Sequence, residues 1–165
     1  EYNVECIIRI GTAGAYTDKL KVFDVINVDK AYSESTYAKD AFEFTPDHFE
    51  HQGAAFNLIN ETAKRMNMPV IAGNIHSSDV FYRSTQGTPK VAADNNCVAV
   101  EMEAFALFAN ARHLNKMAAT ILTISDVIPT GDYISSDQRQ NSLSKMTELA
   151  MESALAIQEY LGKQK

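Results

Sequence analysis

Cys6-Ile7-Ile8-Arg9-Ile10-Gly11-Thr12-Ala13-Gly14 is the stretch of sequence from which the fold can be inferred. Its β-branched residues predict a buried strand over residues 6–10, and its glycines predict a tight turn over residues 11–14. Short apolar runs predict further strands at residues 24–28, 69–73, 97–100 and 118–125. Because helical patterns separate most of these runs, the sequence indicates a mainly parallel α/β sheet with helices on both faces.

Three main helices are predicted from apolar residues at helical spacing. Thr45 and Pro46 form a helix-start signature with Thr45 as N-cap, so the first helix is expected to run from there to about Asn67. The second helix presents one apolar face over residues 104–114, and the third covers residues 143–161. The polar, aromatic-containing segment 31–44 receives no assignment.

The composition is that of a globular protein. The chain has 165 residues, 45% of them hydrophobic, and we expect one domain over residues 1–165. The 15 Lys and Arg residues against 21 Asp and Glu residues give a net charge of −6, without the basic runs of a nucleic-acid-binding protein. The sequence shows neither a membrane span nor a signal peptide pattern. We therefore expect a cytoplasmic protein with no nucleic-acid or membrane partner.

The cysteines and histidines do not predict a disulfide or a metal site. Cys6 and Cys97 lie in apolar runs, which favours reduced, buried thiols. His48 and His51 are three residues apart on the first predicted helix, but no third ligand has suitable spacing, so solvated histidines are preferred. The sequence begins with Glu1 and reaches an apolar run within five residues, so it is expected to be a piece of something longer.

Polar residues stand at the ends of the predicted strands, where ligands bind in open α/β sheets. Arg9 lies inside an apolar run, so its guanidinium requires either a bound anion or a buried carboxylate. Gly11, Thr12 and Gly14 favour the anion, because a glycine turn exposes backbone N–H groups and a hydroxyl suits phosphate oxygens. A structural Arg–carboxylate pair is the alternative.

Two further strand ends carry carboxyl groups. Glu101 and Glu103, framed by Val100 and Met102, are suited to accept hydrogen bonds from paired sugar hydroxyls; alternatively they only charge the first turn of a helix. Asp126 follows a buried strand and Ser125, where desolvation would let its carboxyl act as a general acid near neutral pH. The alternative there is a helix N-cap.

The sequence resembles the bacterial hexameric, DeoD-type purine nucleoside phosphorylases. The resemblance covers essentially the whole chain and rests on four ordered motifs: Ile7-Ile8-Arg9-Ile10-Gly11-Thr12-Ala13-Gly14, Ser78-Asp79-Val80-Phe81-Tyr82, Val100-Glu101-Met102-Glu103-Ala104, and Ser125-Asp126 followed by Arg139. It implies a three-layer α/β/α sandwich with a mixed, mainly parallel central sheet. It also implies a trimer of dimers and reversible phosphorolysis of purine (deoxy)nucleosides to free base and pentose 1-phosphate.

The resemblance also implies roles for individual residues. Phosphate, a co-substrate, would be held by Arg9, Gly11 and Thr12, and no cofactor or metal is implied. The purine nucleoside would contact Phe81, Val100, Glu101, Met102, Glu103 and Ser125, with Glu103 accepting the ribose hydroxyls. Asp126 would protonate N7 of the departing purine, assisted by Arg139.

The sequence departs from this family in two respects, and each leaves an alternative function open. The family's N-terminal segment, with a phosphate loop and its own arginine, is absent from this sequence. Gly11-Thr12-Ala13-Gly14 also resembles the turn of the adenosylhomocysteine/methylthioadenosine nucleosidases, which use water. The alternatives are therefore a hydrolytic purine nucleosidase or a catalytically incomplete nucleoside-binding fragment. Arg9 argues for phosphate over water.

Overall fold

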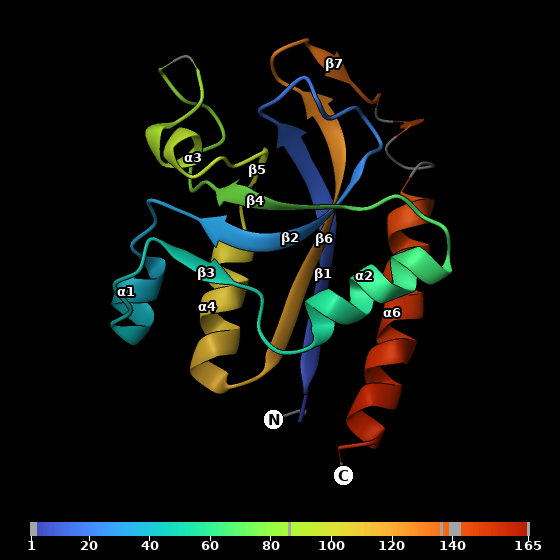
Figure 1. Ribbon diagram of the computed structural model, residues 1–165. Helices are drawn as coiled ribbons and strands as arrows, with labels where there is room; N and C mark the ends of the chain where they lie inside the picture. Colours follow the sequence, from blue (N-terminus) through green and yellow to red (C-terminus); the bar gives the residue numbers. More distant parts are fainter. Residues whose placement is uncertain (1–2, 86, 136, 139–142, 165) are drawn as a thin grey trace.

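The structure is a computed structural model that describes residues 3–85, 87–135, 137–138 and 143–164. Strands and helices alternate along much of the chain, as the sequence pattern predicts (Figure 1). The elements in chain order are β1 (Cys6–Ala15), β2 (Val25–Tyr32), α1 (Tyr37–Phe42), β3 (His48–Glu50), α2 (Ala55–Arg65), β4 (Ile71–Ser77), α3 (Lys90–Asp94), β5 (Ala99–Glu101), α4 (Ala104–Leu114), β6 (Met117–Val127), β7 (Asp132–Tyr133) and α6 (Ser144–Gly162).

The described strands form one mixed sheet in the order β3-β2-β4-β5-β1-β6-β7. The β1–β6, β2–β4 and β4–β5 pairs are parallel, whereas the β1–β5, β2–β3 and β6–β7 pairs are antiparallel. The start of β2 also pairs with β6, antiparallel, so the pairings through β2, β4, β5, β1 and β6 close into a ring. The sequence pattern predicted a mainly parallel sheet but neither the strand order nor this closure.

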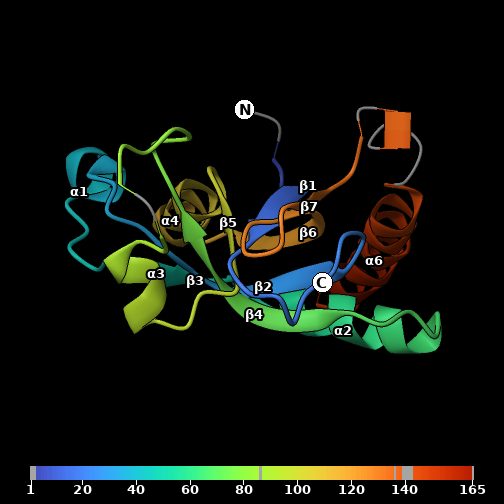
Figure 2. The ribbon, with the colours of Figure 1, turned by 90° about the horizontal axis from the view of Figure 1, so that it is seen from above.

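Helices cover both faces of the sheet, which gives three layers (Figures 1 and 2). On one face α2 and α6 pack together over a core that includes Ile59 and Ile121. On the other face α4 packs with α1 beside it, over a core that includes Phe108 and Leu122. Ile121 and Leu122 are neighbours in β6 and enter opposite cores because successive strand residues point to opposite faces. The expected α/β/α sandwich is confirmed.

β1 is longer than predicted, because the glycines continue the strand instead of forming a turn. Strand hydrogen-bond register with β6 extends over the whole of β1. The glycines allow close packing here: a β-carbon at Gly11 would lie 3.1 Å from the Arg9 guanidinium, and one at Gly14 would lie 2.6 Å from Oδ2 of Asp126. The predicted turn is therefore wrong.

The first predicted helix begins nine residues too early, since α2 begins at Ala55 and not at Pro46. The intervening residues form β3, which pairs with β2 and places Phe49 opposite Ala31. Phe49 is buried and its ring packs against Phe44 and Phe105. Burial of this side chain outweighs the local preference for a helix start at Thr45.

The pairing of β1 with β6 contains one irregularity. Ala13 pairs with Ile124, but the next residue, Gly14, pairs with Asp126, so Ser125 is an extra residue in β6. An extra residue of this kind is a β-bulge, which turns the strand locally and redirects its side chains. Both Ser125 and Asp126 consequently reach the same cavity.

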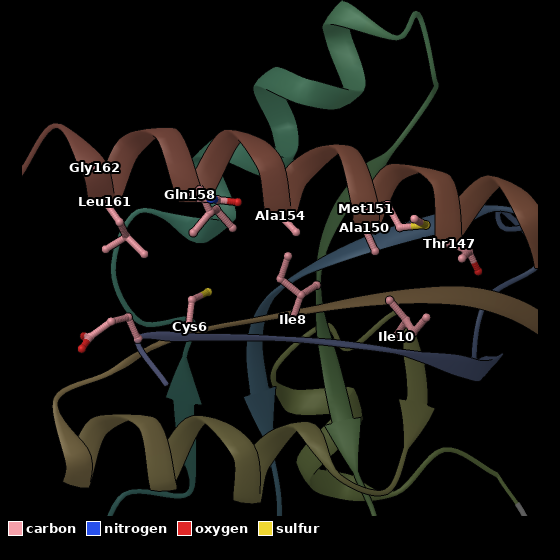
Figure 3. Close-up of a pocket in the computed structure, with 12 residues that line it drawn as sticks. Cys6, Ile8, Ile10, Thr147, Ala150, Met151, Ala154, Gln158, Leu161 and Gly162 are labelled. Carbon is pink, nitrogen blue, oxygen red and sulfur yellow. The ribbon is translucent and has the colours of Figure 1, made fainter. Parts of the chain in front are cut away.

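A groove of about 780 Å³ runs between β1 and α6 (Figure 3). Cys6, Ile8 and Ile10 point from β1 toward Ala154 and Leu161 of α6. β1 pairs with β5 only at Gly14 and Ala15, so in the described part of the chain its other residues have no strand partner on that edge.

No helix in the described part of the chain has the length and hydrophobicity needed to cross a membrane.

Candidate active site

A second cavity, of about 520 Å³, lies where β1, β4, β5 and β6 end. This volume is in the usual range for small-molecule sites. Its lining brings together every site residue named from the sequence except Arg139, which lies outside the described residues: Arg9, Gly11, Thr12, Phe81, Val100, Glu101, Met102, Glu103, Ser125 and Asp126. The larger β1–α6 groove contains none of them.

Arg9 lies on β1 with its guanidinium between two carboxylates. Nη1 is 3.1 Å from Oε2 of Glu101, and Nη2 donates to Oε2 of Glu103. The structural Arg–carboxylate pair is therefore present. Nη1 is nevertheless buried without an aligned hydrogen bond among the described residues, because its ion pair with Glu101 is close but not directed along an N–H. An anion bound beside Arg9 would satisfy this donor.

Glu101 is the buried member of the carboxylate pair and is only 5% exposed. It accepts a hydrogen bond from Ser77 Oγ and others from the backbone N–H groups of Glu103 and Ala104 at the start of α4. Burial raises its pKa above the ordinary value, although Arg9 and these hydrogen bonds act in the opposite direction. Glu101 thus binds the helix start as well as lining the cavity.

Glu103 differs from Glu101 in its exposure. Its side chain is 60% exposed, and its carboxylate contacts only Arg9 among the described residues. Glu103 stands immediately before Ala104, the first residue of α4, and lines the same cavity. Of the two carboxylates, Glu103 therefore has the greater free capacity to accept hydrogen bonds from a ligand.

Asp126 and Ser125 stand together at the bulge of β6. Ser125 Oγ is 2.8 Å from Oδ1 of Asp126, to which it donates, and Oδ2 faces Gly14. Neither residue is a helix N-cap, because β6 continues to Val127 and then turns into β7. This geometry orients one carboxyl oxygen by a hydrogen bond and leaves the other for a ligand.

The remaining wall is mostly apolar. Phe81 lines the cavity but its side chain is 75% exposed, and Met102 is 40% exposed. Sequence reasoning did not name Val80, Ile128 or Ser78 as site residues, although all three line the cavity. Ser78 and Val80 lay in a motif quoted above, so their position just after β4 was the available signal; Ile128, two residues beyond Asp126, offered none.

The two histidines considered as metal ligands do not share a helix. His48 lies in β3 and stacks on Tyr32, whereas His51 follows the strand and stacks on Phe56. The predicted helical location of these histidines is wrong, because burial of Phe49 favours a strand, β3, where a helix was predicted. Among the described residues, no group of three His, Cys, Asp or Glu side chains is arranged to hold a metal ion.

Comparisons with known proteins agree with the fold and the motifs. The model of the phosphorylase superfamily matches residues 1–161. The DeoD-type purine nucleoside phosphorylase of Mycoplasma genitalium is 41% identical over 153 residues, which are 92% of this chain and 64% of the relative. That of Brevibacillus brevis is 39% identical over 158 residues, 93% of this chain and 66% of the relative. The chain thus spans about two thirds of their length.

A solved structure shows the same fold. The purine nucleoside phosphorylase of Toxoplasma gondii, crystallised with immucillin-H, superimposes with a TM-score of 0.81 over 94% of this chain and 65% of that one, at 18% identity. The resemblance inferred from the sequence motifs is confirmed by the similar DeoD-type proteins, and the expected fold by this structure. The chain belongs to the phosphorylase superfamily.

Proposed function

We propose that the protein catalyses reversible phosphorolysis of purine (deoxy)ribonucleosides. The observation that carries the proposal is one cavity that contains both a cation, Arg9, with one guanidinium nitrogen that lacks an aligned hydrogen bond, and an oriented carboxyl group, Asp126, on the paired strands β1 and β6. Phosphorolysis requires a phosphate site and a proton donor for the departing base within one cavity. The DeoD-type names of the similar proteins support the same reaction.

The proposed chemistry assigns a task to each part of the cavity. Arg9, Gly11 and Thr12 hold phosphate, and Glu103 accepts the ribose hydroxyls. Phe81, Val100 and Met102 contact the nucleoside, with Glu101 and Ser125 beside them. A phosphate oxygen forms a bond to C1′ as the C1′–N9 bond breaks. The electron pair of the C1′–N9 bond leaves with the purine. Asp126 gives its proton to N7, which removes the charge that would build on the base.

Arg139 is proposed to assist Asp126, and it lies outside the described residues. No cofactor is proposed, since phosphate is itself the second substrate. Free Cys6 and Cys97 thiols suit a reducing compartment, which supports a cytoplasmic location. We also propose a homohexamer arranged as a trimer of dimers; the exposed apolar residues of the unpaired β1 edge, Ile7 and Ile10, support association between chains.

A hydrolytic nucleosidase is the second candidate. One observation favours it: Arg9 is engaged by Glu101 and Glu103, and a water-using enzyme does not require a cation free for phosphate. The deciding experiment incubates the 165-residue chain with inosine or adenosine, with and without phosphate, and follows free base by chromatography. Release that requires phosphate supports phosphorolysis, and release without it supports hydrolysis. No release in either condition, together with measurable nucleoside binding, supports a catalytically incomplete nucleoside-binding fragment.

A further inference from the structure

A chain of polar contacts links the buried interior to the cavity wall. His76 in β4 is fully buried; its Nδ1 is 2.8 Å from the Tyr16 hydroxyl and its Nε2 is 2.6 Å from Oε2 of Glu34. The other oxygen of Glu34 lies 3.4 Å from Nη2 of Arg83. The same Arg83 nitrogen donates to Ser78 Oγ at 2.8 Å. We refer to His76, Glu34 and Arg83 as the His76 relay.

The direction of the hydrogen bonds to Glu34 follows from the chemistry of the groups. Burial raises the pKa of Glu34, but the hydrogen bond from His76 and the charge of Arg83 lower it by more, so the net pKa is below the ordinary value. An ionised Glu34 only accepts, so Nε2 of His76 carries a hydrogen and donates it. Burial raises the pKa of Tyr16 to about 12, so its hydroxyl keeps its proton and forms a hydrogen bond with Nδ1 of His76. Every contact in the relay therefore has a matched donor and acceptor.

The wall at the end of this relay has little apolar packing to hold it. Ser78 Oγ accepts from the backbone N–H of Val80 and donates to its carbonyl, which makes a tight local turn. Val80 is 49% exposed and Phe81 is 75% exposed, so burial contributes little to fixing them. Segments with few buried contacts open at low free-energy cost. Ser78 itself is 2% exposed, and its backbone N–H donates to the carbonyl of Glu101 at 2.8 Å, which fixes the start of the turn to β5. The contact of Arg83 with Ser78 is the side-chain tie of this turn to a neighbouring element, and it acts on Ser78 Oγ, which holds Val80.

The turn matters because it borders two cavities. Ser78, Val80 and Phe81, here called the 78–81 wall, line the 520 Å³ cavity and also an adjoining one of about 330 Å³. Arg83 and Tyr16 line the adjoining cavity only. The relay therefore acts from outside the 520 Å³ cavity, through Ser78, and has no contact with its phosphate end.

We propose that Glu34 and Arg83 are positioning residues that hold the 78–81 wall in place for the nucleoside, with His76 as their buried anchor. The proposal rests on the proposed function, in which this wall receives the nucleoside. It predicts that loss of the relay loosens the wall and weakens nucleoside binding, while phosphate binding at Arg9 stays unchanged.

The test compares Arg83→Met and Glu34→Gln with a matched surface pair. Arg65 lies 3.5 Å from Glu152 across α2 and α6, so Arg65→Met and Glu152→Gln make the same changes of charge away from both cavities. Hydrogen exchange of residues 78–81 is measured first, because it needs no substrate. We expect faster exchange there in the two relay variants and wild-type exchange in the two controls.

Steady-state kinetics provide the second measurement. The nucleoside KM should rise about tenfold in Arg83→Met and Glu34→Gln, the size expected for loss of one charge-assisted hydrogen bond, with the phosphate KM unchanged. The double variant should be no worse than either single one, because both break the same chain of contacts. Unchanged exchange over residues 78–81 overturns the proposal, as does an equal rise in both KM values. If the wild-type chain has no activity, the proposed function fails but exchange still decides the relay.

Discussion

Gly14 and Asp126 are packed so closely that a β-carbon at position 14 would lie 2.6 Å from Oδ2 and 3.3 Å from Cγ of Asp126. The contact joins β1 to β6 at the point where their register shifts. Any side chain at position 14 must therefore move the carboxyl group or the strands. Glycine at this position is required by the position of the proposed proton donor.

Gly14→Ala tests this contact. We expect kcat to fall by about 10²-fold, the cost of misplacing a catalytic group by about 1 Å. Gly162→Ala is the matched control, because a β-carbon there meets nothing within 4 Å. The measurement is kcat for inosine at saturating phosphate. A Gly14→Ala enzyme with wild-type kcat would show that Asp126 does not act from the observed position.

Asp126→Asn tests the proton donor itself. Asparagine keeps the shape and the acceptor for Ser125 but has no carboxyl proton to give, so kcat should fall by about 10² to 10⁴-fold. Asp132→Asn, at an exposed position in β7, is the control and should leave kcat unchanged. Equal rates for the Asp126→Asn and wild-type enzymes would remove Asp126 from the proposed mechanism.

Arg9→Ala tests the choice between phosphate and water. If Arg9 holds phosphate, release of free base by this variant should no longer respond to added phosphate. A hydrolase should lose little activity by the same change. Lys116→Ala removes a cation that pairs with Glu5 near the surface and serves as the control. The readout is the rate of base release as phosphate is titrated, and a phosphate response preserved in Arg9→Ala would contradict the assignment.

Glu101 predicts a pH dependence of stability. Because burial raises the pKa of Glu101 in the folded protein above its ordinary value of about 4.5, the folded state keeps a proton that the unfolded state loses. Stability contributed by this group is therefore full below about pH 4.5 and declines as pH rises through the folded pKa. Urea unfolding of wild type and Glu101→Gln over this range should show wild type losing stability relative to the variant.

The control for this comparison is Glu148→Gln, at an exposed position on α6. Its stability difference from wild type should not follow pH in the same way. A constant difference between wild type and Glu101→Gln across the range would mean that Glu101 is solvated as well in the folded state as in the unfolded one.

Sequence patterns predicted β1, β2, β4, β5 and β6 and the helices α4 and α6, and they grouped the proposed site residues at strand ends, because apolar runs and strand-end polar residues are local signals. They did not predict β3, β7, α1 or α3. They did not resolve the glycines of β1, whose role depends on Arg9 and on Asp126 across the sheet. The spacing of Glu101 and Glu103 in the sequence also did not show which of the two carboxylates is buried and which is exposed. The structure separates them by burial, since Glu101 receives the N–H groups at the start of α4 whereas Glu103 faces solvent.

The His76 relay was not foreseen for a similar reason. Glu34 and His76 are 42 residues apart, and Glu34 and Arg83 are 49 apart. Neither pair has a local spacing that predicts contact, so only the pairing of β2 with β4 brings them together. The early end of the first predicted strand and the late start of α2 have the same cause, which is tertiary packing that local propensity does not contain.

The bulge at Ser125 separates the requirements of folding from those of chemistry. In a regular strand, neighbouring side chains alternate between faces, and only one of Ser125 and Asp126 would reach the cavity. A variant with one residue deleted at this point can restore an uninterrupted β1–β6 ladder, and its sheet would gain regularity. Such a protein would lose the paired hydroxyl and carboxyl. Mutational screens that select for stability alone would accept this deletion, whereas screens for turnover would reject it.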